Sequence, residues 1–182
     1  LQDRHEIADH LEKDPFLNIY GLGDLDDPIW DRTRWYGFRD SGGLTALFFI
    51  YDSPGIPALI ALTNEAEPMA MLLDEALPLL PDRFQAHLSP GVKEAFGSRW
   101  MVESGIPHYR MAFIDAAAPG KIDTGGIIQL EVRHLEQLQT LYDKSYPGNW
   151  FDPEVFRHNM YFGIMDDRRL VSAGGTHVLS AR

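Results

Sequence analysis

The sequence contains no cysteine in its 182 residues. This absence excludes disulfides, thiol nucleophiles, Cys-ligated zinc and iron–sulfur clusters. Basic residues are also scarce, because 16 lysines and arginines stand against 27 aspartates and glutamates, which gives a formal net charge of −11. Such an acidic surface argues against general binding of nucleic acid, which requires clustered Lys and Arg, and against docking on anionic lipid.

Long hydrophobic runs are missing as well. The longest, residues 44–51, is interrupted by Thr45 and is too short to cross a bilayer. No signal peptide precedes the first residue, Leu1, and the last segment, residues 177–182, stops without a helix cap. We therefore expect a cytoplasmic protein whose chain is trimmed at one end or both. The seven histidines show no metal-binding spacing, so no metal site is expected.

Apolar residues make up 45% of the chain and aromatic residues 12%, which is ample material for a globular core. Hydrophobic periodicity and turn residues predict helices at residues 4–13, 16–22, 68–80 and 132–141, a helix-like stretch at 90–100, and strands at 33–38, 44–51, 58–62, 84–88, 109–114, 127–132, 160–165 and 170–179. Asp152 and Pro153 begin another helix, as N-cap and first helical residue. Residues 116–126, rich in Gly and Pro, are expected to be a linker.

An internal similarity appears when the chain is shifted by 126 residues. Residues 35–40 (WYGFRD) then align with residues 161–166 (YFGIMD), and Leu44 aligns with Leu170. In both copies two helical segments precede an aromatic-aromatic-Gly strand, a tight turn and an apolar strand. This pattern favours a duplication, in which the first copy is complete and the second has only its opening elements.

This order of elements resembles the GNAT N-acetyltransferase superfamily. Residues 14–25 (DPFLNIYGLGDL), with residues 33–37 (TRWYG), and residues 170–178 (LVSAGGTHV) resemble more closely a bacterial tandem subgroup, in which a degenerate N-terminal half precedes a C-terminal half that binds acetyl-CoA. The resemblance implies an α/β fold with a mixed, mostly antiparallel sheet flanked by helices. It divides the chain into a degenerate domain at residues 1–125 and an incomplete catalytic domain at residues 126–182.

The cofactor signature of this superfamily, R/Q-x-x-G-x-G/A, has no match in the sequence, so we expect no cofactor-binding residues in this chain. In the second copy it would begin beyond Arg182. In the first copy the equivalent place, residues 63–69, has no glycine, and Glu65 and Glu67 there would repel a pyrophosphate. We therefore expect the first half to shape the acceptor site or the fold rather than to bind acetyl-CoA.

The resemblance implies that the loop between the two helices of the second copy shapes the pocket for the acceptor amine. The residues predicted for this pocket are Tyr146, Asn149, Trp150 and Phe151, together with His177 on the last strand. The simpler alternatives are that Trp150 and Phe151 pack beneath the loop and that His177 is an ordinary strand histidine. No catalytic acid or base can be assigned from the sequence.

We predict that the parent protein transfers an acetyl group from acetyl-CoA to a primary amine of a small molecule, and that this stretch is inactive alone. The alternative is that residues 1–125 form a non-catalytic ligand-binding or dimerising module. An uncovered sheet edge at residues 170–179 would invite pairing with another chain, so a homodimer is also possible.

Overall fold

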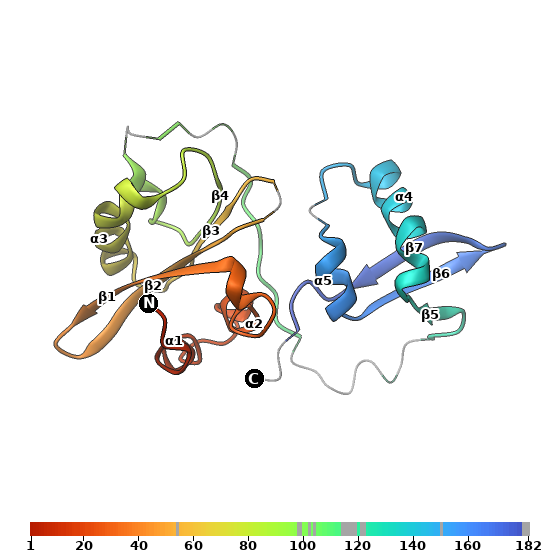
Figure 1. Cartoon of the computed structure of the whole chain (residues 1–182), viewed down its shortest axis with the longest axis horizontal. Helices are drawn as coiled ribbons and strands as arrows, with labels where there is room; N and C mark the ends of the chain where they lie inside the picture. The colour runs from red at the N-terminus through yellow and green to blue at the C-terminus, as the bar shows by residue number, and fades with distance from the viewer. Residues whose placement is uncertain are drawn as a thin grey trace. The chain divides into compact units, whose positions relative to one another are not determined.

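The computed structural model describes residues 1–53, 55–97, 100–101, 103, 105–113, 120, 123–149 and 151–179. The chain forms two compact units, Leu1–Ala112 and Phe113–Ala181 (Figure 1). Both units combine helices with β-sheet, and every strand pairing but one is antiparallel. The predicted α/β class with a mostly antiparallel sheet flanked by helices is therefore confirmed.

The first unit is built on a four-stranded sheet in the order β1-β2-β3-β4. Its elements, in chain order, are α1 (Arg4–Leu11), α2 (Ile19–Asp24), β1 (Thr33–Asp40), β2 (Gly43–Tyr51), β3 (Ala58–Ala61), α3 (Ala66–Ala76) and β4 (Gln85–Leu88). Short 3₁₀ helices occupy Trp30–Arg32, Leu77–Leu79 and Lys93–Phe96. The strands β3 and β4 are parallel, with α3 between them in the chain.

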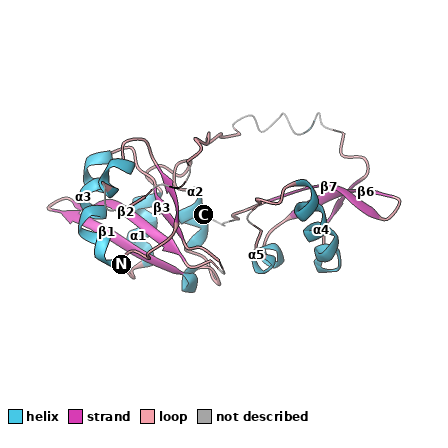
Figure 2. Ribbon diagram, turned by 90° about the horizontal axis from the view of Figure 1, so that it is seen from above, coloured by secondary structure: helices cyan, strands magenta, loops and turns pink. Residues whose placement is uncertain are grey.

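Alternating residues of β2 place apolar side chains on both faces of this sheet. Phe48 and Ile50 belong to a cluster with Leu73 of α3, whereas Phe49 and Tyr51 belong to a second cluster with Ile7 of α1. The sheet is thus covered by α3 on one face and by α1 and α2 on the other (Figures 1 and 2). This two-sided burial explains why residues 44–51 form an almost unbroken apolar run.

The second unit has a three-stranded antiparallel sheet in the order β5-β6-β7. Its elements are β5 (Ile127–Gln129), a 3₁₀ turn at Val132–His134, α4 (Leu135–Ser145), α5 (Pro153–His158), β6 (Tyr161–Asp166) and β7 (Arg169–Gly175). Helices α4 and α5 contribute Leu138 and Phe156 to a core that also contains Leu130, Tyr161 and Leu170. As predicted, Asp152 caps α5, because its side chain accepts a hydrogen bond from the N–H of Glu154 at 2.8 Å.

The two hairpins have the same register after a shift of 126 residues. Trp35 pairs with Phe49 in the first, and Tyr161 pairs with Gly175 in the second. A bulge falls between Phe38 and Arg39 in the first hairpin and between Ile164 and Met165 in the second, which are equivalent positions. All six pairs of the second hairpin have a counterpart in the first.

A glycine lies at the same place in both hairpins and is covered in the same way. A Cβ added at Gly37 would lie 2.6 Å from Leu44 Cδ1 and 2.5 Å from Leu1 Cδ1. A Cβ added at Gly163 would lie 2.5 Å from Leu170 Cδ1 and 3.0 Å from Leu130 Cδ2. In both hairpins a larger residue would force these leucine side chains to shift, so the two hairpins share the same close approach.

The residues Leu1 and Leu130 also bind their hairpins alike. The backbone nitrogen of Leu1 donates to Trp35 O at 2.6 Å, and that of Leu130 donates to Tyr161 O at 2.8 Å. Each leucine is therefore tied by a backbone hydrogen bond to the aromatic residue at the equivalent position of its hairpin.

Several sequence predictions were wrong. Residues 109–113 form no strand, and Tyr109, Met111 and Phe113 are exposed. The helix-like stretch at 90–100 shrinks to the 3₁₀ turn Lys93–Phe96, and the helix predicted at 68–80 ends at Ala76. Ile114 and most of the predicted linker at 116–126 lie outside the described residues. Among the residues described, no helix has both the length and the apolar character needed to cross a membrane.

Candidate functional site

Two backbone hydrogen bonds shape the end of α4 and the turn that follows it. The N–H of Tyr146 donates to Tyr142 O at 2.7 Å, and the N–H of Asn149 donates to Tyr146 O at 2.9 Å. Pro147 and Gly148 lie between these two anchors, where they end the helix and turn the chain. The sequence therefore fixes Tyr146 and Asn149 beside the last turns of α4.

Phe151 is the aromatic residue that joins this loop to the core. Its ring centroid lies 5.2 Å from that of Tyr142, and 6.1 Å from those of Phe156 and Tyr161. The contacts are tilted or edge-on, which is the favoured geometry for aromatic pairs. Phe151 is thus packed beneath the loop, as the simpler alternative proposed, and it also borders the surface hollow described next.

A hollow of about 350 Å³ opens between α4 and this loop. It is lined by Gln139, Tyr142, Asp143, Tyr146, Pro147, Asn149 and Phe151. Three of the predicted pocket residues, Tyr146, Asn149 and Phe151, therefore border one hollow. Trp150 lies outside the described residues.

His177 does not border this hollow. The strand β7 ends at Gly175, so His177 follows the strand instead of lying within it, as the sequence had predicted. The residue as a whole is exposed, although partial burial of its imidazole lowers the pKa of that ring, and its backbone carbonyl accepts a hydrogen bond from Asn159 Nδ2 at 3.0 Å. The strand stops early because Thr176 ties the chain to Met160 through bonds between their backbone and side-chain groups.

The sequence reasoning missed Pro147 and the three residues of α4 that line the hollow, Gln139, Tyr142 and Asp143. Only the apolar spacing of α4 was used there, and these three residues lie beside that apolar stripe. Tyr142 and Tyr146 are four residues apart, and so are Gln139 and Asp143, which is the spacing of side chains that share one helix face. Burial raises the pKa of the Tyr142 hydroxyl.

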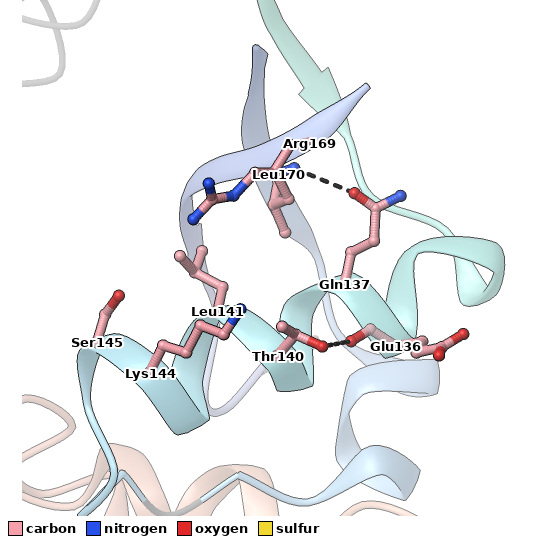
Figure 3. Close-up of a pocket in the computed structure, with 8 residues that line it drawn as sticks. All are labelled: Glu136, Gln137, Thr140, Leu141, Lys144, Ser145, Arg169 and Leu170. Atoms are coloured by element: carbon pink, nitrogen blue, oxygen red, sulfur yellow. Dashed lines mark hydrogen bonds between the residues drawn. The ribbon is translucent and has the colours of Figure 1, made fainter. Parts of the chain in front are cut away.

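A second hollow of similar size, about 340 Å³, lies on another side of α4 (Figure 3). It is lined by Glu136, Gln137, Thr140, Leu141, Lys144, Ser145, Arg169 and Leu170. Gln137 Oε1 accepts a hydrogen bond from the N–H of Leu170 at 3.1 Å, and Thr140 Oγ1 donates to Glu136 O at 2.8 Å. The first of these bonds joins α4 to β7, and the second lies within α4.

Residues 63–69 of the first unit, the place that the sequence indicates as equivalent to the cofactor loop, form hydrogen bonds of their own. The N–H of Thr63 donates to Ser89 Oγ at 2.9 Å, and the N–H of Glu65 donates to Thr63 Oγ1 at 2.9 Å. Two amides just before Ala66, the first residue of α3, therefore donate to hydroxyls, while the N-cap residue Glu65 makes no side-chain capping hydrogen bond. Glu65 and Glu67 add negative charge at the same place, which disfavours an anion.

Among the described residues, no group of three or more His, Asp or Glu side chains is arranged to hold a metal ion. Comparison with protein-family models, with curated proteins and with solved structures found no match to this chain.

Proposed function

We propose that the chain belongs to a tandem GNAT N-acetyltransferase, in which the first unit is a degenerate copy and the second unit begins the catalytic copy. The parent protein would transfer an acetyl group from acetyl-CoA to a primary amine of a small molecule. The observation that carries this proposal is the shared register of the two hairpins, including the bulge and the covered glycine.

The register is a demanding criterion for duplication. A hairpin can place its bulge at many positions, and a shift of one residue would move every side chain to the other face. Here the pairing, the bulge, the glycine and the leucine that covers it all coincide at one shift of the chain. Common ancestry of the two copies explains this agreement with a single event.

The order of elements supports the family assignment. The second unit runs strand, helix, helix, strand, turn and strand, which is the opening order of the superfamily. The first unit begins with two helices and a hairpin and continues with β3, α3 and the parallel strand β4. Taken together, the two units cover all of the expected order except its last helix and strand.

The two units differ in how well their described residues fit the cofactor and the acceptor of such an enzyme. Acetyl-CoA would supply the activated acetyl group, yet the place in the first unit that corresponds to its binding loop fits a pyrophosphate poorly, because the amides of Thr63 and Glu65 already donate to hydroxyls and Glu65 and Glu67 are acidic. The hollow between α4 and the loop that follows it, which Tyr146 and Asn149 border, has the size and polarity for part of a small acceptor. We therefore assign acceptor binding to the second unit and a structural role to the first.

The hydrogen bonds that the amides of Thr63 and Glu65 donate to hydroxyls also favour a second candidate function, for the first unit taken alone. In that interpretation it is a non-catalytic module, which binds another ligand or a second copy of the chain. A mixture of the isolated first unit with acetyl-CoA should show no binding under either interpretation, so the test must use the complete protein.

The test measures the stability and activity of the full-length protein with acetyl-CoA. Millimolar acetyl-CoA should raise its melting temperature, and a panel of primary amines should release free thiol from acetyl-CoA. Asn149→Ala should lower kcat/KM for the best amine by about tenfold, as expected for the loss of one hydrogen bond to a bound ligand. Thr140→Val, in the other hollow, is the matched control and should leave kcat/KM unchanged.

The absence of any stabilisation by millimolar acetyl-CoA would contradict the enzyme proposal and favour the binding module. Stabilisation without thiol release from any amine would place the protein among cofactor-binding proteins that do not transfer the acetyl group.

A further inference from the structure

The hollow between α4 and the loop that follows it combines three aromatic rings with one carboxylate. Tyr142, Tyr146 and Phe151 supply the rings, and Asp143 supplies the carboxylate. The rings of Tyr142 and Phe151 are tilted by 58° to each other with their centroids 5.2 Å apart, so they form a corner rather than a stack. Tyr146 is 62% exposed, which leaves its ring accessible from solvent.

The Asp143 carboxylate makes no hydrogen bond or ion pair with any residue that the structure describes. Its neighbour in the chain, Lys144, borders the other hollow, beside Leu141 and Arg169 (Figure 3). Among the described residues, those that line the hollow with Asp143 include no Lys or Arg. The negative charge is therefore left available to a ligand.

We propose that this hollow binds a positively charged ammonium group of the acceptor molecule. An ammonium ion is attracted to the faces of aromatic rings through their quadrupole, and quaternary ammonium ligands are recognised by cages of such rings. A carboxylate at the border of the cage adds direct charge attraction. The inference rests on the proposed function in one respect only, namely that the ligand is the acceptor of the acetyl group.

The chemistry of acetyl transfer then restricts the acceptor further. The nitrogen that attacks a thioester carbonyl must carry a free electron pair, so it is a neutral amine at that moment. A cage of aromatic rings with a carboxylate stabilises the opposite, charged state. The bound ammonium is therefore a second nitrogen centre, and the acceptor class is a small molecule with one amine to be acetylated and another group that stays cationic.

The test uses the 182-residue chain and two probes of nearly equal size and shape. Tetramethylammonium carries a permanent positive charge and no exchangeable proton, whereas tert-butanol is neutral. Binding is followed by the amide NMR signals of residues 139–151. We expect saturable shifts with tetramethylammonium, and affinity for tert-butanol weaker by at least about fivefold, the factor that a cation–π contribution of this kind predicts.

The variants separate the carboxylate from the rings. Asp143→Asn and Tyr146→Leu should each weaken tetramethylammonium binding by about fivefold, whereas Tyr146→Phe should keep it within about twofold because the aromatic face remains. Glu136→Gln is the matched control, since it removes one negative charge from an exposed position of the same helix in the other hollow. Asp143 and Tyr146 are exposed, so these substitutions should not disturb folding.

The proposal is overturned by equal binding of both probes, by unchanged binding in Asp143→Asn, or by an equal loss in Glu136→Gln. These outcomes differ from failure of the proposed function, because the probe experiment contains no acetyl-CoA. Tetramethylammonium binding by a protein that never releases thiol would leave an ammonium site without acetyl transfer. If the full-length protein transfers acetyl groups but the chain does not bind tetramethylammonium, the enzyme proposal stands and the proposed ammonium site is contradicted.

Discussion

The two hairpins share a backbone frame but fill it differently. In the first, the paired residues Trp35 and Phe49 stack with their ring centroids 4.3 Å apart. In the second, Tyr161 is paired with Gly175, and its ring lies over the position where a side chain of residue 175 would stand. One hairpin thus buries two aromatic rings, and the other lets a single ring cover a glycine.

The opposite faces differ as well. Phe48 of β2 is fully buried beneath α3, and Tyr36 of β1 stacks on it at 4.8 Å. At positions of the second hairpin on the equivalent face, Phe162 and Ile164 remain 44% and 42% exposed. Register is therefore set by the strands themselves, through the glycine and the bulge, whereas burial depends on what packs against them.

The largest difference should appear when one phenylalanine is removed from each equivalent face. Phe48→Ala creates a cavity in a fully buried core and should lower the free energy of unfolding of the first unit by about 4 kcal/mol. Phe162→Ala should cost the second unit about 1 kcal/mol or less, because its ring is partly in water. Urea unfolding followed by hydrogen exchange of peptides from each unit measures both changes.

Equal losses for Phe48→Ala and Phe162→Ala would show that the exposed face is buried in solution, for example by a second copy of the chain. That result would support the predicted homodimer and would require a dependence of stability on protein concentration.

The neighbouring glycines Gly174 and Gly175 offer a sharper test of the Tyr161 pairing. A Cβ at residue 175 would overlap the buried Tyr161 ring, whereas a Cβ at residue 174 would meet nothing within 4 Å. Gly175→Ala should therefore lower the free energy of unfolding of the second unit by about 2 kcal/mol, as for an overpacked core. Gly174→Ala should be neutral or slightly stabilising, because alanine loses less backbone entropy than glycine.

Thermal unfolding and peptide hydrogen exchange distinguish these two variants. Similar stabilities for both would mean that the Tyr161 ring moves aside at little cost, and the contrast between the two hairpins would then lose its physical basis.

The sequence was sufficient to predict the hairpins and the helices that have strong local signals. The apolar run at 44–51, the turn glycines and the Asp152 cap each act over a few residues, so pattern alone identifies them. The strand predicted at 109–114 failed for a different reason. Tyr109, Met111 and Phe113 alternate as strand residues do, yet a strand requires a partner edge, which alternation cannot reveal. Arg110 is instead held by Leu17 O and stacks over Tyr20.

The candidate site shows the same limit. Tyr146, Asn149 and Phe151 were predicted because the family resemblance implies that their loop shapes the acceptor pocket, and local turns keep Tyr146 and Asn149 together. Asp143 was missed because its importance depends on the aromatic rings around it, and Phe151 approaches α4 only through tertiary packing. His177 was assigned to the pocket because a longer strand was expected, and the Thr176–Met160 bonds end the regular pairing first.

The last expected difference between the two units is the dependence of their stability on pH. Burial raises the pKa of the Asp24 carboxyl in α2 to about 7, against the opposing influence of Arg32. Since the folded pKa lies above the unfolded one, the folded first unit holds an extra proton between roughly pH 4 and pH 7. The contribution of Asp24 to the free energy of unfolding should therefore be greatest below pH 4. It should be lost as the pH rises through 7.

The expected change is on the order of 2 kcal/mol between pH 4 and pH 8, about half of the full linkage value, because the side chain is only partly shielded from water. Asp24→Asn should remove this contribution, and at pH 8 it should make the first unit more stable than the wild-type unit. The control is Asp26→Asn, two residues away. Urea unfolding at several pH values, read from peptides of each unit, checks the assignment. A pH dependence that persists in Asp24→Asn, or that is centred on the second unit, would show that another group is responsible.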